Sequence, residues 1–120
     1  MMNIVAVVQA RIGSSRFPGK VIKKIGSKTI IEILLTRLKS SRRINKIIVA
    51  TTTNKIDDKL ESIVEKIGFN CFRGSNENVL KRFYEASKKY NADIVVRITG
   101  DCPLVDSKII DKCIDTLIKN

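Results

Sequence analysis

The residues best suited to chemistry gather in one short segment near the N-terminus. Residues 9–20 read QARIGSSRFPGK, so that Arg11, Arg16 and Lys20 alternate with glycine and serine. Small residues let backbone N–H groups approach a polyphosphate, and the cations offset its charge. The spacing fits neither a Walker A loop nor a dinucleotide-binding fingerprint. The alternative is an ordinary basic surface loop, and we predict that the segment binds phosphate.

A second segment, RITGDCPLVD at residues 97–106, places carboxylates after an apolar run. Asp101 directly follows Gly100, and a carboxylate beside a residue that permits close approach suits a Mg²⁺ ion bridging phosphate oxygens. Asp106 precedes the last helical pattern, where an N-cap is the expected role. We therefore predict that Asp101 binds Mg²⁺ and that Asp106 caps a helix.

The formal net charge of +11 requires either an anionic partner or a structural explanation. The lysines are spread along the chain instead of forming one block, and aromatic residues make up only 5% of it. Nucleic-acid-binding proteins more often cluster their cations and add stacking aromatics. This distribution favours solvated helix faces, and a basic nucleic-acid-binding module stays an alternative.

Composition indicates one globular domain over residues 1–120. Hydrophobic residues make up 43% and charged residues 29%, which is too apolar for a disordered chain. No apolar stretch is long enough for a membrane span or a signal-peptide core. Cys71, Cys102 and Cys113 lack the close pairing of metal or redox motifs, and without histidine a transition-metal site is not expected. These features predict a cytoplasmic protein.

Three apolar runs, at residues 4–8, 47–50 and 94–96, do not alternate polar with apolar residues. Such runs predict strands buried on both faces, as in a parallel sheet covered by helices. A shorter run at residues 70–72 predicts one more strand.

Helical patterns lie between and after these strands. Apolar stripes cover residues 30–38, 56–67, 79–90 and 109–117. We expect the first helix to begin near a Ser27 cap, and the second to carry Asp57 and Asp58 in its first turn and to stop at Gly68. The alternation of strands and helices predicts a three-layer α/β/α sandwich with a mainly parallel sheet. Ligands bind such sheets at the carboxyl ends of the strands.

The segments with chemistry resemble a known family. Residues 9–20, together with TGDCPL at 99–104, are similar to the paired signature of the cytidylyltransferases that includes 3-deoxy-manno-octulosonate and acylneuraminate cytidylyltransferases. ATT at residues 50–52 and RGSNENVLKRF at 73–83 resemble most the branch of the spore coat polysaccharide biosynthesis protein F. The resemblance covers essentially the whole chain.

This resemblance implies a Rossmann-like nucleotide-diphospho-sugar transferase fold, of which residues 1–120 are the N-terminal, nucleotide-binding part. Family members are longer, and their second half brings most of the sugar site, a further metal carboxylate and much of the dimer contact. A truncated fold is therefore expected here. A homodimer is expected only of a full-length form.

The resemblance also implies the reaction: CMP is transferred from CTP to a sugar acid or related sugar, with release of pyrophosphate, for surface polysaccharide synthesis. Arg11, Arg16 and Lys20 would lie near the triphosphate, and Asp101 would bind Mg²⁺. The implied nucleotide-binding residues are Ala10, Arg11, Gly13, Ser14, Ser15, Arg16, Lys20, Thr52, Arg73 and Asn78. A uridylyl- or guanylyltransferase and an inactive nucleotide-binding fragment stay as alternatives.

Overall fold

A computed structural model describes residues 2–13, 18–100 and 105–119. Among the predicted site residues, Ser14, Ser15, Arg16 and Asp101 lie outside these ranges. A four-stranded sheet forms the centre of the molecule, and its pairings are parallel. Its order is β5-β4-β1-β6, made of β5 (Asn70–Gly74), β4 (Lys46–Thr52), β1 (Ile4–Gln9) and β6 (Ile94–Thr99). The predicted mainly parallel sheet is confirmed.

The strands differ in burial. All of β1 is buried, because it lies between β4 and β6 and is covered on both faces. The prediction that residues 94–96 are buried on both faces is wrong, since the side chains of Ile94, Val95 and Val96 are only half-buried. In the described sheet β6 has one neighbour and lies at an edge, so less of its surface is covered.

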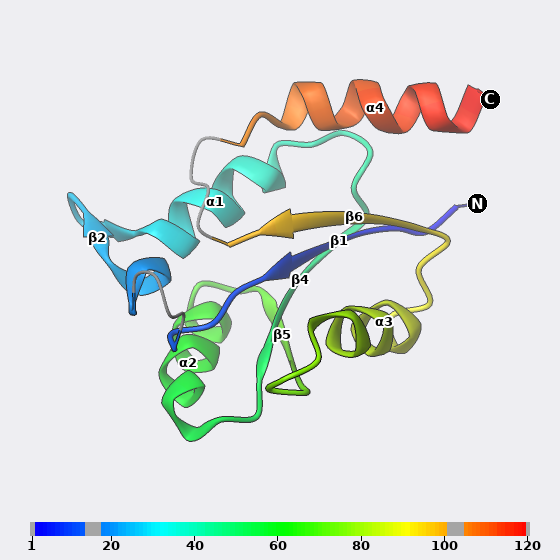
Figure 1. The fold of residues 1–120 in the computed structure, drawn as a ribbon. Helices are drawn as coiled ribbons and strands as arrows, with labels where there is room; N and C mark the ends of the chain where they lie inside the picture. Colours follow the sequence, from blue (N-terminus) through cyan, green and yellow to red (C-terminus); the bar gives the residue numbers. More distant parts are fainter. Residues whose placement is uncertain (1, 14–17, 101–104, 120) are drawn as a thin grey trace.

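Helices cover both faces of the sheet (Figure 1). Val8 and neighbouring strand residues pack with Leu34 of α1 (Ile30–Lys39) and Leu60 of α2 (Asp58–Lys66), and Ile110 of α4 (Ser107–Lys119) packs against the same cluster. On the other face, Val7 packs in a cluster with Ala86 of α3 (Val79–Lys89). These layers confirm the three-layer α/β/α architecture.

A β-hairpin absent from the sequence prediction precedes α1. It pairs β2 (Lys24–Ile25) with β3 (Lys28–Thr29) around a turn in which Gly26 has φ 68°, and it projects beyond the carboxyl end of the sheet (Figure 1). Ser27 lies in this turn, so the expected Ser27 cap is wrong. Thr29 caps α1 instead, because its hydroxyl accepts a hydrogen bond of 3.2 Å from the N–H of Glu32.

Two other helix boundaries agree with the sequence. Gly68 follows α2 with φ 92°, a conformation that glycine adopts without strain, which confirms the predicted stop. Asp106 accepts a hydrogen bond of 2.9 Å from the N–H of Lys108 in the first turn of α4, which confirms the predicted cap. The prediction that Asp57 lies in the first turn of α2 is wrong, because Asp57 lies just before α2, in the 3-10 helix η2 (Lys55–Asp57), and does not cap α2 through its side chain.

The outer faces of α3 and α4 expose apolar side chains. Leu80 and Tyr84 of α3 are 73% and 63% exposed, and Ile109 and Leu117 of α4 are 62% and 61% exposed. The apolar stripe predicted for the last helix is therefore only partly in the core, through Ile110 and the buried Ile114. Within the described ranges, none of the helices combines the length and apolar content that a bilayer crossing requires.

Candidate functional site

The two segments with chemistry meet at the carboxyl end of β1. The N–H of Gly100, just after β6, donates a hydrogen bond of 2.7 Å to the carbonyl of Gln9. A Cβ on Gly100 would lie 2.6 Å from the Cβ of Ala10, so only glycine fits this approach. The chain therefore enters the segment containing Asp101 directly beside Ala10, where the cationic loop begins.

The loop after β1 is closed at its base. The N–H of Gly19 donates a hydrogen bond of 2.8 Å to the carbonyl of Ile12, and Gly19 has φ 77°. Arg11 and Gly13 are exposed at this base. Lys20 begins the 3-10 helix η1 (Lys20–Ile22) and helps line a cavity of about 640 Å³. The hydrogen bond from Gly19 to Ile12 thus brings Lys20 to the same region as Ala10, Arg11 and Gly13, and their binding of phosphate stays a prediction.

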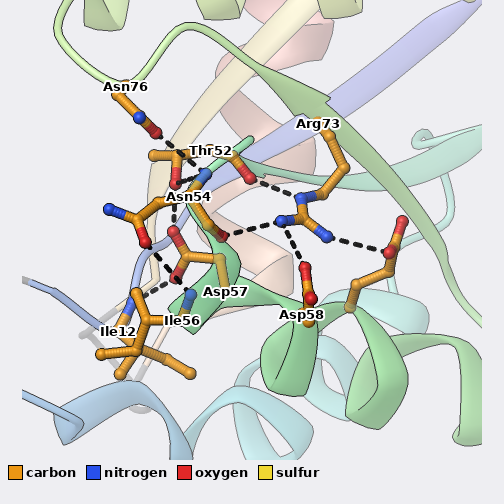
Figure 2. Close-up of polar contacts among 9 residues, drawn as sticks. Ile12, Thr52, Asn54, Ile56, Asp57, Asp58, Arg73 and Asn76 are labelled. Atoms are coloured by element: carbon orange, nitrogen blue, oxygen red, sulfur yellow. Dashed lines mark hydrogen bonds and ion pairs between the residues drawn. The ribbon is translucent and has the colours of Figure 1, made fainter.

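A buried carboxylate ties this loop to β4 (Figure 2). Asp57 is 1% exposed, and its Oδ1 accepts a hydrogen bond of 2.7 Å from the N–H of Ile12. Its Oδ2 accepts a hydrogen bond from the hydroxyl of Thr52 at the end of β4. A charged acceptor that is buried with both oxygens used contributes strongly to the local structure. Asp57 therefore fixes the position of the loop base.

Sequence reasoning missed this role of Asp57. Its neighbour Asp58 is also acidic and also lies at the start of the predicted helix. In the tertiary structure Asp57 is buried and Asp58 is exposed. Helical spacing was the available signal, because Asp57 lies three residues before Leu60 and seven before Val64, on the apolar face, and Asp58 does not.

Arg73 of β5 holds the segment after β4 (Figure 2). Its guanidinium donates to the carbonyl of Thr52, to the carbonyl of Asn54 at 2.9 Å, and to Asp58 and Glu61, both at 2.9 Å. Burial alone would lower the pKa of Arg73, but these two carboxylates outweigh it and hold the pKa above its ordinary value. These four hydrogen bonds tie Arg73 to the protein, and its direct contact with a nucleotide stays a prediction.

Thr52 and Asn78 lie at the same edge but already have intramolecular partners. Thr52 is 2% exposed, and its hydroxyl donates to Asp57. Asn78 is exposed and caps α3, because its Oδ1 accepts a hydrogen bond of 2.9 Å from the N–H of Lys81. The predicted role of both residues in nucleotide binding remains untested.

A metal site at this edge would depend on few protein ligands. Among the described residues, no group of three or more acidic, cysteine or histidine side chains could hold a metal ion. Mg²⁺ bound to a nucleotide commonly takes one or two carboxylates, with phosphates and water supplying the rest. Asp57 is already engaged with Ile12 and Thr52. Asp101, the predicted ligand, lies outside the described residues, so its binding of Mg²⁺ stays a prediction.

A parallel α/β sheet with a glycine-containing cationic loop at its carboxyl edge is the architecture of nucleotide-binding proteins. The family model of the cytidylyltransferases matches residues 5–120. The chain belongs to the cytidylyltransferase family.

Relatives of this chain include proteins from an archaeon and a bacterium. It is 50% identical over 119 residues to an uncharacterised protein of Methanocaldococcus jannaschii, covering 99% of this chain and 49% of that protein. It is 39% identical over 115 residues to the spore coat polysaccharide biosynthesis protein SpsF of Bacillus subtilis, covering 92% of this chain and 48% of that protein. The chain thus spans about half the length of these curated relatives.

Solved structures share the fold. A cytidylyltransferase from Leptospira borgpetersenii matches with a TM-score of 0.95 and 46% identity, over 100% of this chain and 50% of that one. A CMP:2-keto-3-deoxy-manno-octonic acid synthetase, solved in complex with CTP, matches with a TM-score of 0.89 and 27% identity, over 98% of this chain and 48% of that one. These matches agree with the predicted Rossmann-like nucleotidyltransferase fold.

Proposed function

We propose that this chain is the nucleotide-binding half of an enzyme that transfers CMP from CTP to a sugar acid or related sugar and releases pyrophosphate. The observation that carries the proposal is the meeting of the cationic loop and the segment after β6 at Ala10, in a chain of the cytidylyltransferase family. The CTP complex of a structural relative supports CTP as the nucleotide.

In this reaction a sugar hydroxyl attacks the α-phosphorus of CTP. A bond forms between the sugar oxygen and phosphorus, and the hydroxyl proton passes to water. The bond from phosphorus to the bridging oxygen breaks, and pyrophosphate leaves with the electron pair. The protein contributes by positioning the phosphates and by offsetting their charge. In the proposal Arg11, Arg16 and Lys20 do so for the triphosphate. Mg²⁺, held by Asp101, would supply further positive charge to the phosphates when bound.

The remaining loops would hold the nucleoside. Ala10 and Gly13 let the nucleotide approach the backbone, and Ser14 and Ser15 supply polar contacts in the same loop. Thr52, Arg73 and Asn78 would lie around the cytidine. In the described structure Arg73 donates to the carbonyl of Thr52 and Asp57 accepts from its hydroxyl, so the end of β4 is held in place before a ligand binds. We place the reaction in the cytoplasm and in surface polysaccharide synthesis, with a homodimer as the assembly of a full-length form.

A test of the metal assignment uses Asp101→Asn, because asparagine keeps the size of the side chain and removes its charge. Calorimetric titration with CTP, with and without Mg²⁺, should show that the variant loses the gain in affinity that Mg²⁺ gives the unaltered chain. A loss of at least tenfold is expected, at the scale of a charge-assisted contact. Thermal unfolding should be unchanged.

Asp106→Asn is the matched control, because Asp106 caps α4 and asparagine caps a helix nearly as well. This control should keep both its stability and its Mg²⁺ dependence. An Asp101→Asn protein that retains normal Mg²⁺ dependence would contradict the assignment of Asp101.

A further inference from the structure

Arg82 is a buried cation at a core position of α3. Its residue is 2% exposed, and its neighbours Phe83 and Ala86 belong to the apolar cluster between α3 and the sheet. An arginine is almost never buried unless its charge has a partner, because desolvation of a charge is costly. The position of Arg82 therefore requires an explanation.

The guanidinium of Arg82 connects the ends of two strands. Its Nε donates a hydrogen bond of 3.0 Å to Oε1 of Gln9, the last residue of β1. Its Nη1 donates a hydrogen bond of 2.8 Å to the carbonyl of Ser75, which follows β5. Both contacts lie at the carboxyl end of the sheet, where the candidate site is. Since arginine can only donate, this contact also fixes the orientation of the Gln9 amide.

The backbone leaves room for this side chain. A Cβ on Gly74 would lie 2.9 Å from the Cγ of Arg82 and 2.9 Å from the ring of Phe72. A side chain at position 74 would therefore displace either Arg82 or Phe72. Gly74 is thus part of the space that Arg82 occupies.

The charge of Arg82 is not neutralised within the described part of the chain. None of the ion pairs there includes Arg82, whose described hydrogen bonds go to neutral oxygens. Burial lowers the pKa of Arg82, and the positive charge of Arg11 lowers it further, while Asp57 acts in the opposite direction. Gln9, which accepts a hydrogen bond from Arg82, lies two residues before Arg11, so both cations lie at the carboxyl end of β1. An anion at this edge of the sheet would offset their charge.

We propose that Arg82 is a positioning residue of the nucleotide site, which holds Gln9 at the end of β1 and supplies a fixed positive charge behind Arg11 for the polyphosphate. This inference rests on the proposed function, because it takes the anion to be the phosphates of the nucleotide. Arg82 is buried and acts on the phosphates through its field and through Gln9, without touching them.

The experiment compares three ligands that differ in phosphate number: CTP, CMP and cytidine, each titrated with excess Mg²⁺. In Arg82→Met the long stem stays and the charge is lost. We expect about tenfold weaker binding of CTP, a smaller loss for CMP, and a loss of less than about twofold for cytidine, because the interaction of a fixed charge grows with the charge of the ligand. The melting temperature of the ligand-free variant should fall, because the side-chain oxygen of Gln9 and the carbonyl of Ser75 lose their donor.

Lys81→Met is the matched control, because Lys81 is the exposed neighbour of Arg82 on α3 and loses the same formal charge. It should bind the three ligands as the unaltered chain does. Arg82→Lys keeps the charge and should restore the preference for CTP over cytidine. This variant also provides the test if Arg82→Met does not fold.

The outcomes separate this inference from the proposed function. If the unaltered chain binds CTP but Arg82→Met weakens all three ligands by the same factor, Arg82 has only a structural role and the inference is wrong. A preference for CTP that is lost equally in Arg82→Lys and Arg82→Met also overturns it. If the unaltered chain does not bind CTP at all, both the proposed function and this inference fail.

Discussion

At the scale of single residues, the contacts that shape the candidate site come from side chains beneath its surface. Asp57 connects Ile12 to Thr52, and Arg73 holds the next residues of the same segment. Exposed Arg11 and Gly13 thereby gain a defined base on which a ligand can bind. Fixing polar groups in advance lowers the cost of ordering them when a ligand binds.

The first prediction concerns Asp57. Asp57→Ala leaves the N–H of Ile12 and the hydroxyl of Thr52 without their buried partner, so the free energy of unfolding should fall by about 2–4 kcal/mol. Asp57→Asn retains one acceptor oxygen and should lose about half as much. Urea unfolding measures both changes, and titration with CTP should show weaker binding in the variants that remain folded.

Asp58→Asn is the appropriate control for that comparison. Asp58 is exposed and pairs with Arg73, and a surface ion pair contributes at most about 1 kcal/mol. Equal effects of the Asp57 and Asp58 substitutions would contradict the role assigned to Asp57.

A second prediction compares two cysteines. Burial, with the nearby carboxylate of Glu61, raises the pKa of Cys71 to about 12, so its thiol stays protonated at neutral pH. Cys113 is exposed on α4. Because the thiolate is the reactive form, iodoacetamide at pH 8 should modify Cys113 and leave Cys71 intact in the folded protein. Peptide mass spectrometry measures this difference, which should disappear in urea. Labelling of Cys71 at the rate of Cys113 in the native state would contradict the described packing.

At the scale of elements, the carboxylate of Asp111 attaches α4 to the chain after α1. Asp111 accepts hydrogen bonds from the hydroxyl of Ser41 and from the N–H groups of Arg42 and Arg43. The side chain of Arg37 adds a hydrogen bond of 2.8 Å to the carbonyl of Val105, just before α4. These contacts fix the near end of α4 while its outer face stays exposed.

The third prediction follows from Asp111. Burial alone would raise its pKa, but the hydrogen bonds from Ser41, Arg42 and Arg43 outweigh it and lower the pKa below the ordinary value. Its contribution to stability is therefore present above the pKa of the unfolded chain and is lost as pH falls through the folded-state pKa. Asp111→Asn should lower stability at pH 7 by about 1 kcal/mol.

The difference between the two proteins should shrink on acidification, as melting temperatures from pH 7 down to pH 2 would show. Asp115→Asn, which removes an exposed pair with Arg43, should have a smaller effect at every pH. A difference that stays constant with pH would argue against the ionised Asp111 as the anchor.

Periodicity and strand-end position made much of this architecture predictable. Continuous apolar runs marked the sheet, and the loop with Arg11 and Lys20 could be placed at its edge because it follows the first strand directly. The hairpin before α1 was missed because each of its strands has only two residues, although the Gly26-Ser27 pair is a recognised turn signal. The burial of Arg82 could not be predicted from the sequence, because helical periodicity expects an apolar side chain at that position.

At the scale of the whole molecule, this chain spans about half the length of its relatives. In the described structure the candidate nucleotide site lies at the carboxyl end of the sheet, and β6 is an outer strand of that sheet.

The fourth prediction is that the isolated 120-residue chain binds CTP but forms no CMP-sugar, because the sugar site implied by the family resemblance belongs to the second half. Pyrophosphate release with and without sugar acids measures this directly. Sustained release that depends on the sugar would contradict it.

The central place of β1 also has a consequence for folding kinetics. Its two parallel partners come from distant parts of the chain, and β6 pairs Ile94 with Ile4 across about three quarters of the sequence. Pairings of such high contact order form slowly. We expect the edge where Gly100 meets Ala10 to form only together with the pairing of β1 and β6, so that states without this pairing do not bind the nucleotide. CTP should accordingly slow unfolding while leaving the refolding rate unchanged, and stopped-flow chevron plots with and without CTP can separate the two rates.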